Sequence, residues 1–127
     1  MKRLVVDIAP GEYTITRLPK GSEPPSADNA GLVSVTSTAD GMSVVCPTNV
    51  APESDHTRPG WRLLTVRGPL EFDLTGVMAA LAGELAAAGV TLLAVSTYDT
   101  DHVLVQSVDL TRATKALREA GHEIGPL

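Results

Sequence analysis

The sequence of 127 residues contains one cysteine, only four aromatic residues and no run of basic residues. A single cysteine excludes an internal disulfide. Nucleic acids and anionic membranes bind surfaces where lysine and arginine cluster, whereas this chain has a formal net charge of -5. The aromatic residues are also too few for a platform on which bases stack. We therefore expect neither a nucleic-acid nor a membrane partner.

Long hydrophobic runs are absent as well. The longest nearly uncharged stretch, residues 74–98, contains Glu84 and is divided by Gly89, whereas a membrane-spanning helix needs about 20 consecutive apolar residues. The apolar run after the first three residues is short and is interrupted by Asp7, so it does not read as a secretory signal. With 43% hydrophobic residues the chain is nevertheless far from disordered. We expect a globular protein in the cytoplasm.

Several kinds of catalytic and cofactor site lack their signatures. His56, His102 and His122 are far apart and have no carboxylate or cysteine at metal-ligand spacing. The glycines form neither a dinucleotide nor a phosphate-binding fingerprint. Cys46 ends an apolar run, which favours a buried small residue over a nucleophile. We expect no metal, no cofactor and no catalytic cysteine.

The first half of the chain consists of β-type segments and loops. The Asp40-Gly41 pair supplies the positive φ angles of a tight turn, which favours a hairpin around it. Residues 19–31 and 47–60 are rich in proline and glycine, so we predict loops there. The predicted strands are residues 3–8, 12–18, 32–38 and 42–46. We assign residues 1–59 to one unit without a helix between its strands.

The second half, residues 60–127, alternates between strands and helices. We predict strands at 61–66, 90–97, 102–108 and 122–127, with helices at 76–88 and after residue 109. Asp73 or Thr75 is expected to cap the first helix and Asp109 or Thr111 the second. Gly89 and Gly121 are expected to end them in the left-handed conformation. In the second helix, the residues predicted to face inward are Leu110, Ala113, Leu117 and Ala120.

This order, β-α-β-β-α-β, is that of a ferredoxin-like α+β sandwich, and the first half then reads as a degenerate copy of the same unit. The helix at 76–88 carries Glu84 as its only charged residue. A sheet covers one side of such a helix, and a second subunit is a plausible cover for another. We therefore expect a homodimer.

Two motifs resemble ACT-domain proteins: Gly68-Pro-Leu-Glu-Phe-Asp-Leu-Thr-Gly-Val77 and Ser96-Thr-Tyr-Asp-Thr-Asp-His-Val-Leu-Val105. The likeness is to small bacterial proteins with tandem ACT domains, related to the regulatory domains of aspartokinases and to the CASTOR arginine sensors of animals. It implies two ACT units, the first of them degenerate, and a non-catalytic regulatory module that binds an amino acid between ACT units. Leu74 departs from those sensors, which carry a glutamate there.

The resemblance also implies which residues face the ligand. They lie in the turn before the first helix and in the later hairpin: Phe72, Asp73, Thr75, Gly76, Val77, Thr97, Tyr98 and Asp101. The start of a helix offers unpaired amides and the positive end of a dipole to an α-carboxylate. Asp101 can accept charge-assisted hydrogen bonds from an α-ammonium. Acidic residues at a hairpin tip also serve the turn alone, so both roles stay open.

Two alternatives to a ligand sensor remain. One is a dimerisation or interaction module without a ligand, which the degenerate first half and Leu74 favour. The other is a small enzyme that uses Asp99, Asp101 and His102 for proton transfer. Neighbouring residues of a strand face opposite sides, which makes this third reading the weakest.

Overall fold

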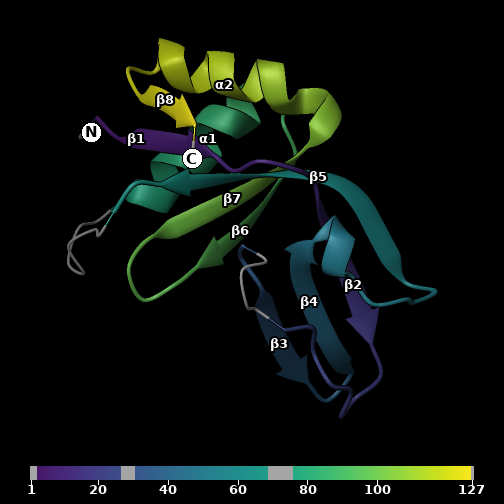
Figure 1. The fold of residues 1–127 in the computed structure, drawn as a ribbon. Coiled ribbons are helices and arrows are strands. Elements are labelled where there is room, and N and C mark those ends of the chain that lie inside the picture. Colours follow the sequence, from purple (N-terminus) through teal and green to yellow (C-terminus); the bar gives the residue numbers. More distant parts are fainter. Residues whose placement is uncertain (1–2, 27–30, 69–75, 127) are drawn as a thin grey trace. The chain divides into compact units, whose positions relative to one another are not determined.

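The computed structural model describes residues 3–26, 31–68 and 76–126. The chain forms two compact units (Figure 1). One, which we call the helical unit, consists of Met1–Pro10 and Arg62–Leu127, and the other, the strand unit, consists of Gly11–Trp61. The predicted domains, 1–59 as a degenerate ACT-like copy and 60–127 as a complete one, stay a prediction.

The helical unit has the predicted β-α-β-β-α-β order and is ferredoxin-like. Its elements along the chain are the end of β5 (Thr57–Val66), α1 (Val77–Ala87), β6 (Leu92–Ser96), β7 (Asp101–Gln106), α2 (Leu110–Glu119) and β8 (Glu123–Pro126), with a 3-10 turn at Ser107–Asp109 before α2. The mixed α/β fold predicted from the sequence is confirmed.

An additional strand from the start of the chain, β1 (Val5–Ile8), lies inside this sheet. It pairs antiparallel with β5 and parallel with β8, so the strand order is β6-β7-β5-β1-β8. The strand after α2 is an edge strand, as predicted. Because β1 separates β5 from β8, residues about 120 positions apart in sequence become neighbours: Val5 pairs with Glu123.

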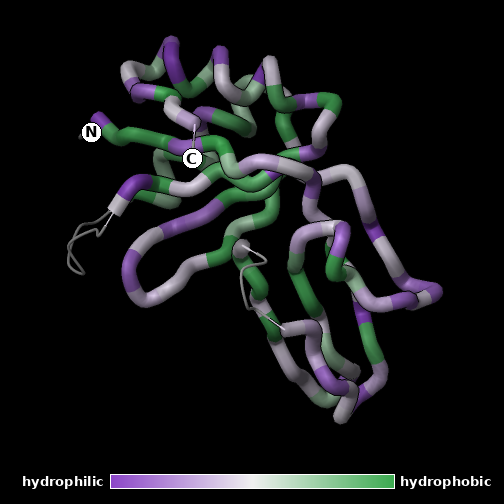
Figure 2. The backbone as a smooth tube through the Cα atoms, viewed as in Figure 1, coloured by the Kyte–Doolittle hydropathy of each residue, from purple (hydrophilic) through white to green (hydrophobic). Residues whose placement is uncertain are grey.

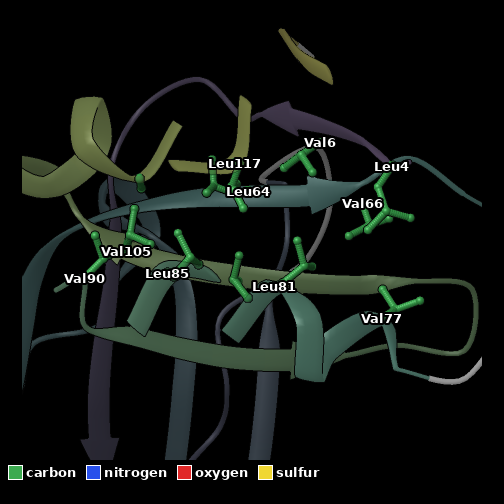
Figure 3. Packing of buried hydrophobic residues seen from close by; sticks show 12 residues of the cluster. Leu4, Val6, Leu64, Val66, Val77, Leu81, Leu85, Val90, Val105 and Leu117 are labelled. Carbon is green, nitrogen blue, oxygen red and sulfur yellow. The ribbon is translucent and has the colours of Figure 1, made fainter. Parts of the chain in front are cut away.

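The core of the helical unit lies between the two helices and one face of this sheet. Along β5 the side chains of Leu64 and Val66 alternate with those of Leu63 and Thr65, as the pleat requires. Figure 3 shows side chains of this cluster, which come from both helices and from the strands. The buried residues are Leu4, Val6, Leu64, Val66, Val77, Leu81, Leu85, Val90, Val103, Val105, Ala113 and Leu117.

Both helices end as their glycines predicted. Gly89 and Gly121 have φ angles of 76° and 99°. The amide of the residue after each glycine donates to the carbonyl five positions earlier, at 3.0 Å from Val90 to Leu85 and 3.0 Å from His122 to Leu117. This is the Schellman arrangement, which satisfies carbonyls that the helix leaves unpaired.

The caps predicted for the first helix, Asp73 and Thr75, lie outside the described residues. Gly76 occupies the N-cap position of α1, and no described side chain caps that helix. Asp109 precedes α2 but makes no capping bond. Its carboxylate pairs with Arg112 instead, at 3.5 Å, because the 3-10 turn before α2 turns Asp109 into a helical backbone conformation. Ala120, predicted to face inward, is exposed because α2 has already ended.

The strand unit is an antiparallel sheet in the order β3-β4-β2-β5. Its strands are β2 (Tyr13–Leu18), β3 (Ser34–Thr38), β4 (Gly41–Pro47) and the first part of β5, with a short 3-10 turn at Thr48–Val50. The hairpin around Asp40-Gly41 is confirmed. Hydrophobic residues occur along β4 (Figure 2). A small core consists of Leu18, Met42, Val44 and Cys46. Within the described part of this unit there is no α-helix.

The predicted loop over residues 47–60 is wrong at its end, since β5 begins at Thr57. Between the pairs Tyr13–Trp61 and Ile15–Arg58 the register shifts: one residue of β2 opposes Pro59 and Gly60 of β5. This is a β-bulge. Gly60 has a φ of 85°, the left-handed conformation that such bulges use, and proline is tolerated there because the ladder is interrupted.

Candidate functional site

The β6–β7 hairpin is fixed to the end of β5. The hydroxyl of Thr100 donates to the carbonyl of Val66 at 2.6 Å. Within the tip, the Thr97 amide donates to the Thr100 carbonyl at 2.9 Å, and the Thr97 hydroxyl bonds the same carbonyl at 3.0 Å. The tip therefore lies beside the point where β5 leads into the turn before α1.

The start of α1 is open to solvent. Gly76 is exposed, has a φ of 81°, and an added Cβ would meet no atom of the described residues within 4 Å. Val77, the first residue of α1, is buried in the core. The first amides of a helix have no acceptor within the helix, and no side chain of the described residues caps them. This end of α1 presents hydrogen-bond donors beside a glycine whose missing side chain leaves room for a ligand among the described residues.

The described residues of the predicted site differ in exposure. Tyr98 is 99% exposed. Asp101 is half-buried, and its Oδ1 accepts a hydrogen bond of 2.7 Å from Ser96, its cross-strand partner. Three further predicted site residues, Phe72, Asp73 and Thr75, lie outside the described residues. The hairpin thus supplies an exposed aromatic ring and a carboxylate that one hydroxyl orients.

His102 does not act together with Asp101. Its Nδ1 lies 2.9 Å from the hydroxyl of Thr65 on β5, whereas Asp101 bonds Ser96. Burial lowers the pKa of His102, and the Asp101 charge opposes that shift. Because adjacent strand residues face opposite sides, the proton-transfer group considered above does not assemble around these two side chains.

Sequence reasoning missed an ion pair between β1 and the residue after β5. Arg67 donates from Nε and Nη2 to the two oxygens of the buried Asp7, at 2.9 and 2.5 Å. This bidentate bond raises the pKa of Arg67. Gly125 of β8 lies directly against the pair. No local sequence pattern predicts this ion pair, because Asp7 and Arg67 are 60 positions apart.

A second missed feature is the buried His122. Its Nδ1 accepts the amide of Leu4 at 3.1 Å, and its Nε2 lies 2.9 Å from Glu84 of α1. Since Nδ1 is an acceptor, the proton is on Nε2, which donates to the carboxylate. The imidazole therefore joins α1, the start of β1 and the turn after α2.

Three of the cavities on the described surface have volumes of about 370 Å³ or more. Two belong to the strand unit, have volumes of about 790 and 370 Å³, and are both lined by Arg17, Asp55 and His56. The third, about 430 Å³, belongs to the helical unit and includes Arg62 and Arg118. Among the described residues no group of histidine, cysteine or acidic side chains is arranged to hold a metal ion, and none of the described helices has the length and hydropathy of a membrane span.

The model of the ACT domain matches residues 56–119, which covers β5 to the end of α2. The chain belongs to the ACT-domain family. A second family model, described as an N-terminal domain, matches residues 11–54. Its bounds fall within the strand unit, so that unit has a recognised family pattern of its own.

Relatives of this ACT protein include animal proteins named cytosolic arginine sensor for mTORC1 subunit 1. The sequence is 35% identical over 66 residues to the bovine protein and 46% identical over 46 residues to the human one. The matches cover 51% and 35% of this chain. The chain spans only 20% and 14% of the length of those two relatives.

Solved structures extend the likeness to the whole chain. A protein from Agobacterium tumefaciens is 36% identical, with a TM-score of 0.89 over 100% of this chain and 96% of that one. The ligand-free regulatory subunit of aspartate kinase from Thermus thermophilus has a TM-score of 0.64 at 11% identity, over 91% of this chain and 96% of that chain. The second likeness shows the fold alone.

Proposed function

We propose that this ACT protein is a non-catalytic regulatory module that binds an amino acid where the start of α1 meets the tip of the β6–β7 hairpin. The observation that carries the proposal is the Thr100–Val66 hydrogen bond of 2.6 Å, which holds the tip beside the end of β5, the strand that precedes α1 in the chain. The names of the relatives, an arginine sensor and a kinase regulatory subunit, support the same class of role and a cytosolic location.

The start of α1 suits the ligand's α-carboxylate. No described side chain caps its first-turn amides, and no described atom lies within 4 Å of a Cβ placed on Gly76. Backbone donors together with the helix dipole favour an anion at this position. In this proposal Val77 acts through its amide, since its side chain belongs to the core, and Phe72, Asp73 and Thr75 remain the further ligand contacts predicted from the sequence.

The hairpin suits the α-ammonium. Asp101 accepts one hydrogen bond from Ser96 through Oδ1, and a carboxylate has further acceptor capacity on both oxygens. Thr97 positions the tip, and the exposed ring of Tyr98 is available to cover a ligand or an adjoining ACT unit. These contacts recognise only the α-carboxylate and α-ammonium of the ligand. Selectivity for its side chain would then come from an ACT–ACT interface, which we propose is formed by a homodimer.

The decisive measurement is calorimetric titration of the full chain with each common amino acid, with thermal shift as the first screen. A ligand that binds only the folded state raises apparent stability. Asp101→Ala is expected to weaken binding about tenfold or more, the equivalent of one charge-assisted bond. Asp99→Ala is the matched control, with the same charge removed from the same exposed tip. Absence of binding by any amino acid at millimolar concentration would reject the proposal.

The second candidate is an assembly module without a ligand. It is favoured by the solvent side of α1, where the exposed residues are Ala79, Gly83, Ala86 and Ala87. Small residues let another helix approach closely, and a face without charge is unusual for a monomer. Light scattering after gel filtration separates the two candidates: a dimer that Ala86→Glu dissociates, and that no amino acid or Asp101→Ala affects, supports this one.

A further inference from the structure

The cavity of about 430 Å³ in the helical unit lies where β1 and β8 end side by side. Parallel pairing places Ile8 opposite Pro126. The amide of Ala9 donates to the Leu63 carbonyl at 3.0 Å, which holds the chain after β1 against β5. The apolar part of the lining consists mainly of Ile8, Pro10, Ile124 and Pro126. The volume is within the range of small-molecule sites.

Arg62 supplies the first charge of this cavity. Its Nη2 donates to the Ala9 carbonyl at 3.3 Å, which fixes the guanidinium beside the end of β1. Its Nε is buried and has no hydrogen-bond partner in the described structure. Buried donors in folded proteins are nearly always paired, and a guanidinium can only donate. Among the described residues the guanidinium therefore has a neutral carbonyl as acceptor and no carboxylate to balance its charge.

Arg118 supplies the second charge, from the last turn of α2. Arg67, Arg112 and Lys115 of the helical unit each form an ion pair with a carboxylate. Arg118 forms no such pair with any described residue. The lining of the cavity contains no carboxylate. In a chain of net charge -5, this is a local positive site.

We propose that this cavity binds a small monocarboxylate with an apolar body, such as a medium-chain fatty acid. Arg62 and Arg118 hold the carboxylate, since guanidinium groups match its planar geometry. The isoleucine and proline side chains cover the alkyl part. A monocarboxylate is favoured over an amino acid, because an α-ammonium would meet two guanidinium groups and no carboxylate in the lining.

The site is separate from the amino-acid site proposed above. Arg62 and Val66 are at opposite ends of the same stretch of β5, about 13 Å apart at the rise of a strand. Because β1 runs antiparallel to β5, the end of β1 lies beside Arg62, whereas Thr100 is bonded to Val66. A second ligand class can therefore reach the helical unit without contact with the hairpin tip.

The test is a titration of the ¹⁵N-labelled full chain with hexanoate, followed by amide chemical shifts. Hexanoate is expected to shift the amides of Ile8, Ala9, Ile124 and Gly125 first. Acetate is expected to bind more weakly, by up to about fourfold for each methylene removed. Hexanamide, which has the same body without charge, and inorganic phosphate, which has charge without the body, are both expected to bind more weakly than hexanoate.

The variants separate a built site from general attraction between charges. Arg118→Gln, at an exposed position where folding is not at risk, is expected to raise the dissociation constant of hexanoate about tenfold, and Arg62→Gln at least as much. Lys115→Gln removes an exposed cation of the same helix outside the cavity and is expected to change nothing. Asp101→Ala is expected to leave hexanoate binding intact, which keeps this inference independent of the amino-acid site.

Three results would overturn the inference. The first is that hexanoate leaves the four amides unshifted. The second is that Lys115→Gln and Arg118→Gln weaken hexanoate binding equally, which indicates general charge attraction. The third is that hexanamide or phosphate binds as tightly as hexanoate. Equal binding of hexanamide would show that the two arginines do not contribute, and equal binding of phosphate would show that the apolar lining does not.

Discussion

The hydroxyl of Thr100 donates a hydrogen bond of 2.6 Å to the carbonyl of Val66, although the two residues are 34 positions apart. The bond joins a hairpin tip to the last residue of a central strand. It fixes the position of a tip whose own bonds, between Thr97 and Thr100, are local. If the hairpin forms one side of a ligand site, this bond sets its distance from the other side.

Thr100→Val tests that role, because valine keeps the shape and removes only the hydroxyl. We expect the free energy of unfolding to fall by about 1 kcal/mol, typical of one hydrogen bond, and amino-acid affinity to fall with it. Urea unfolding and calorimetric titration measure the two effects. Thr91→Val, an exposed threonine before β6, is the control. If Thr100→Val and Thr91→Val bind amino acids equally well, the bond does not position the site.

Gly125 and Gly83 are expected to respond to alanine with opposite signs. A Cβ on Gly125 would lie 2.6 Å from Oδ1 of Asp7, a buried carboxylate that Arg67 already holds. Relief of that clash must move the carboxylate away from its partner, so Gly125→Ala is expected to cost about 1–3 kcal/mol. A Cβ on Gly83 meets nothing within 4 Å. Gly83→Ala in the interior of α1 is therefore expected to stabilise the protein by about 0.5–1 kcal/mol.

Thermal and urea unfolding of these two variants give the comparison directly. The same chemical change is made twice, so only the surroundings differ. A neutral or stabilising Gly125→Ala would show that the Asp7 carboxylate can move without a loss of stability. A destabilising Gly83→Ala would instead indicate that the exposed side of α1 contacts a second subunit.

Local chemistry was enough to predict the elements whose ends are set by neighbouring residues. Gly89 and Gly121 predicted both helix ends, and Asp40-Gly41 predicted a hairpin, because each requirement is met within a few residues. The pair Pro59-Gly60 led to a wrong prediction for the same reason. Locally the pair is typical of a turn, but because it pairs against β2 it forms a bulge inside a strand. The insertion of β1 beside β8 depends on pairs more than 100 positions apart, which no local pattern contains.

The candidate site divides in the same way. The hairpin tip around Thr97 and Asp101 was predictable, since turn residues between apolar strands mark it. Its attachment through Thr100 to Val66 was not, because any of several hydroxyls nearby could have made that bond. Arg62 and Arg118 gave no signal either. They share a cavity only after β1, β5, α2 and β8 have come together.

His122 is expected to be the most sensitive polar position of the helical unit. His122→Ala removes the acceptor of the Leu4 amide and the donor to Glu84, and it leaves a cavity beside the core. Together these losses are expected to cost about 2–4 kcal/mol. Glu84→Gln keeps a carbonyl oxygen as acceptor for Nε2, so its expected cost is below about 1 kcal/mol. Urea unfolding measures both; equal costs would show that the carboxylate charge, not the hydrogen bond, matters.

The stability of the protein is expected to fall with pH below about 6.5 through His102. Burial lowers its pKa beneath the ordinary value of 6.5, and the Asp101 charge offsets part of that shift. Between the two pKa values the unfolded chain binds more protons than the folded protein does, so the free energy of unfolding rises with pH in that window. The contribution is complete above pH 6.5 and is lost as the pH falls toward the folded value.

His102→Gln keeps a polar partner for Thr65 and removes the titration. Its free energy of unfolding, measured in urea between pH 5 and 7.5, is therefore expected to depend less steeply on pH than that of the wild type. An NMR titration of the His102 ring in folded and urea-unfolded protein gives the two pKa values directly. A ring that titrates in the folded protein at or above its value in the unfolded chain would contradict the prediction, because the Asp101 charge would then outweigh the burial between β5 and β7.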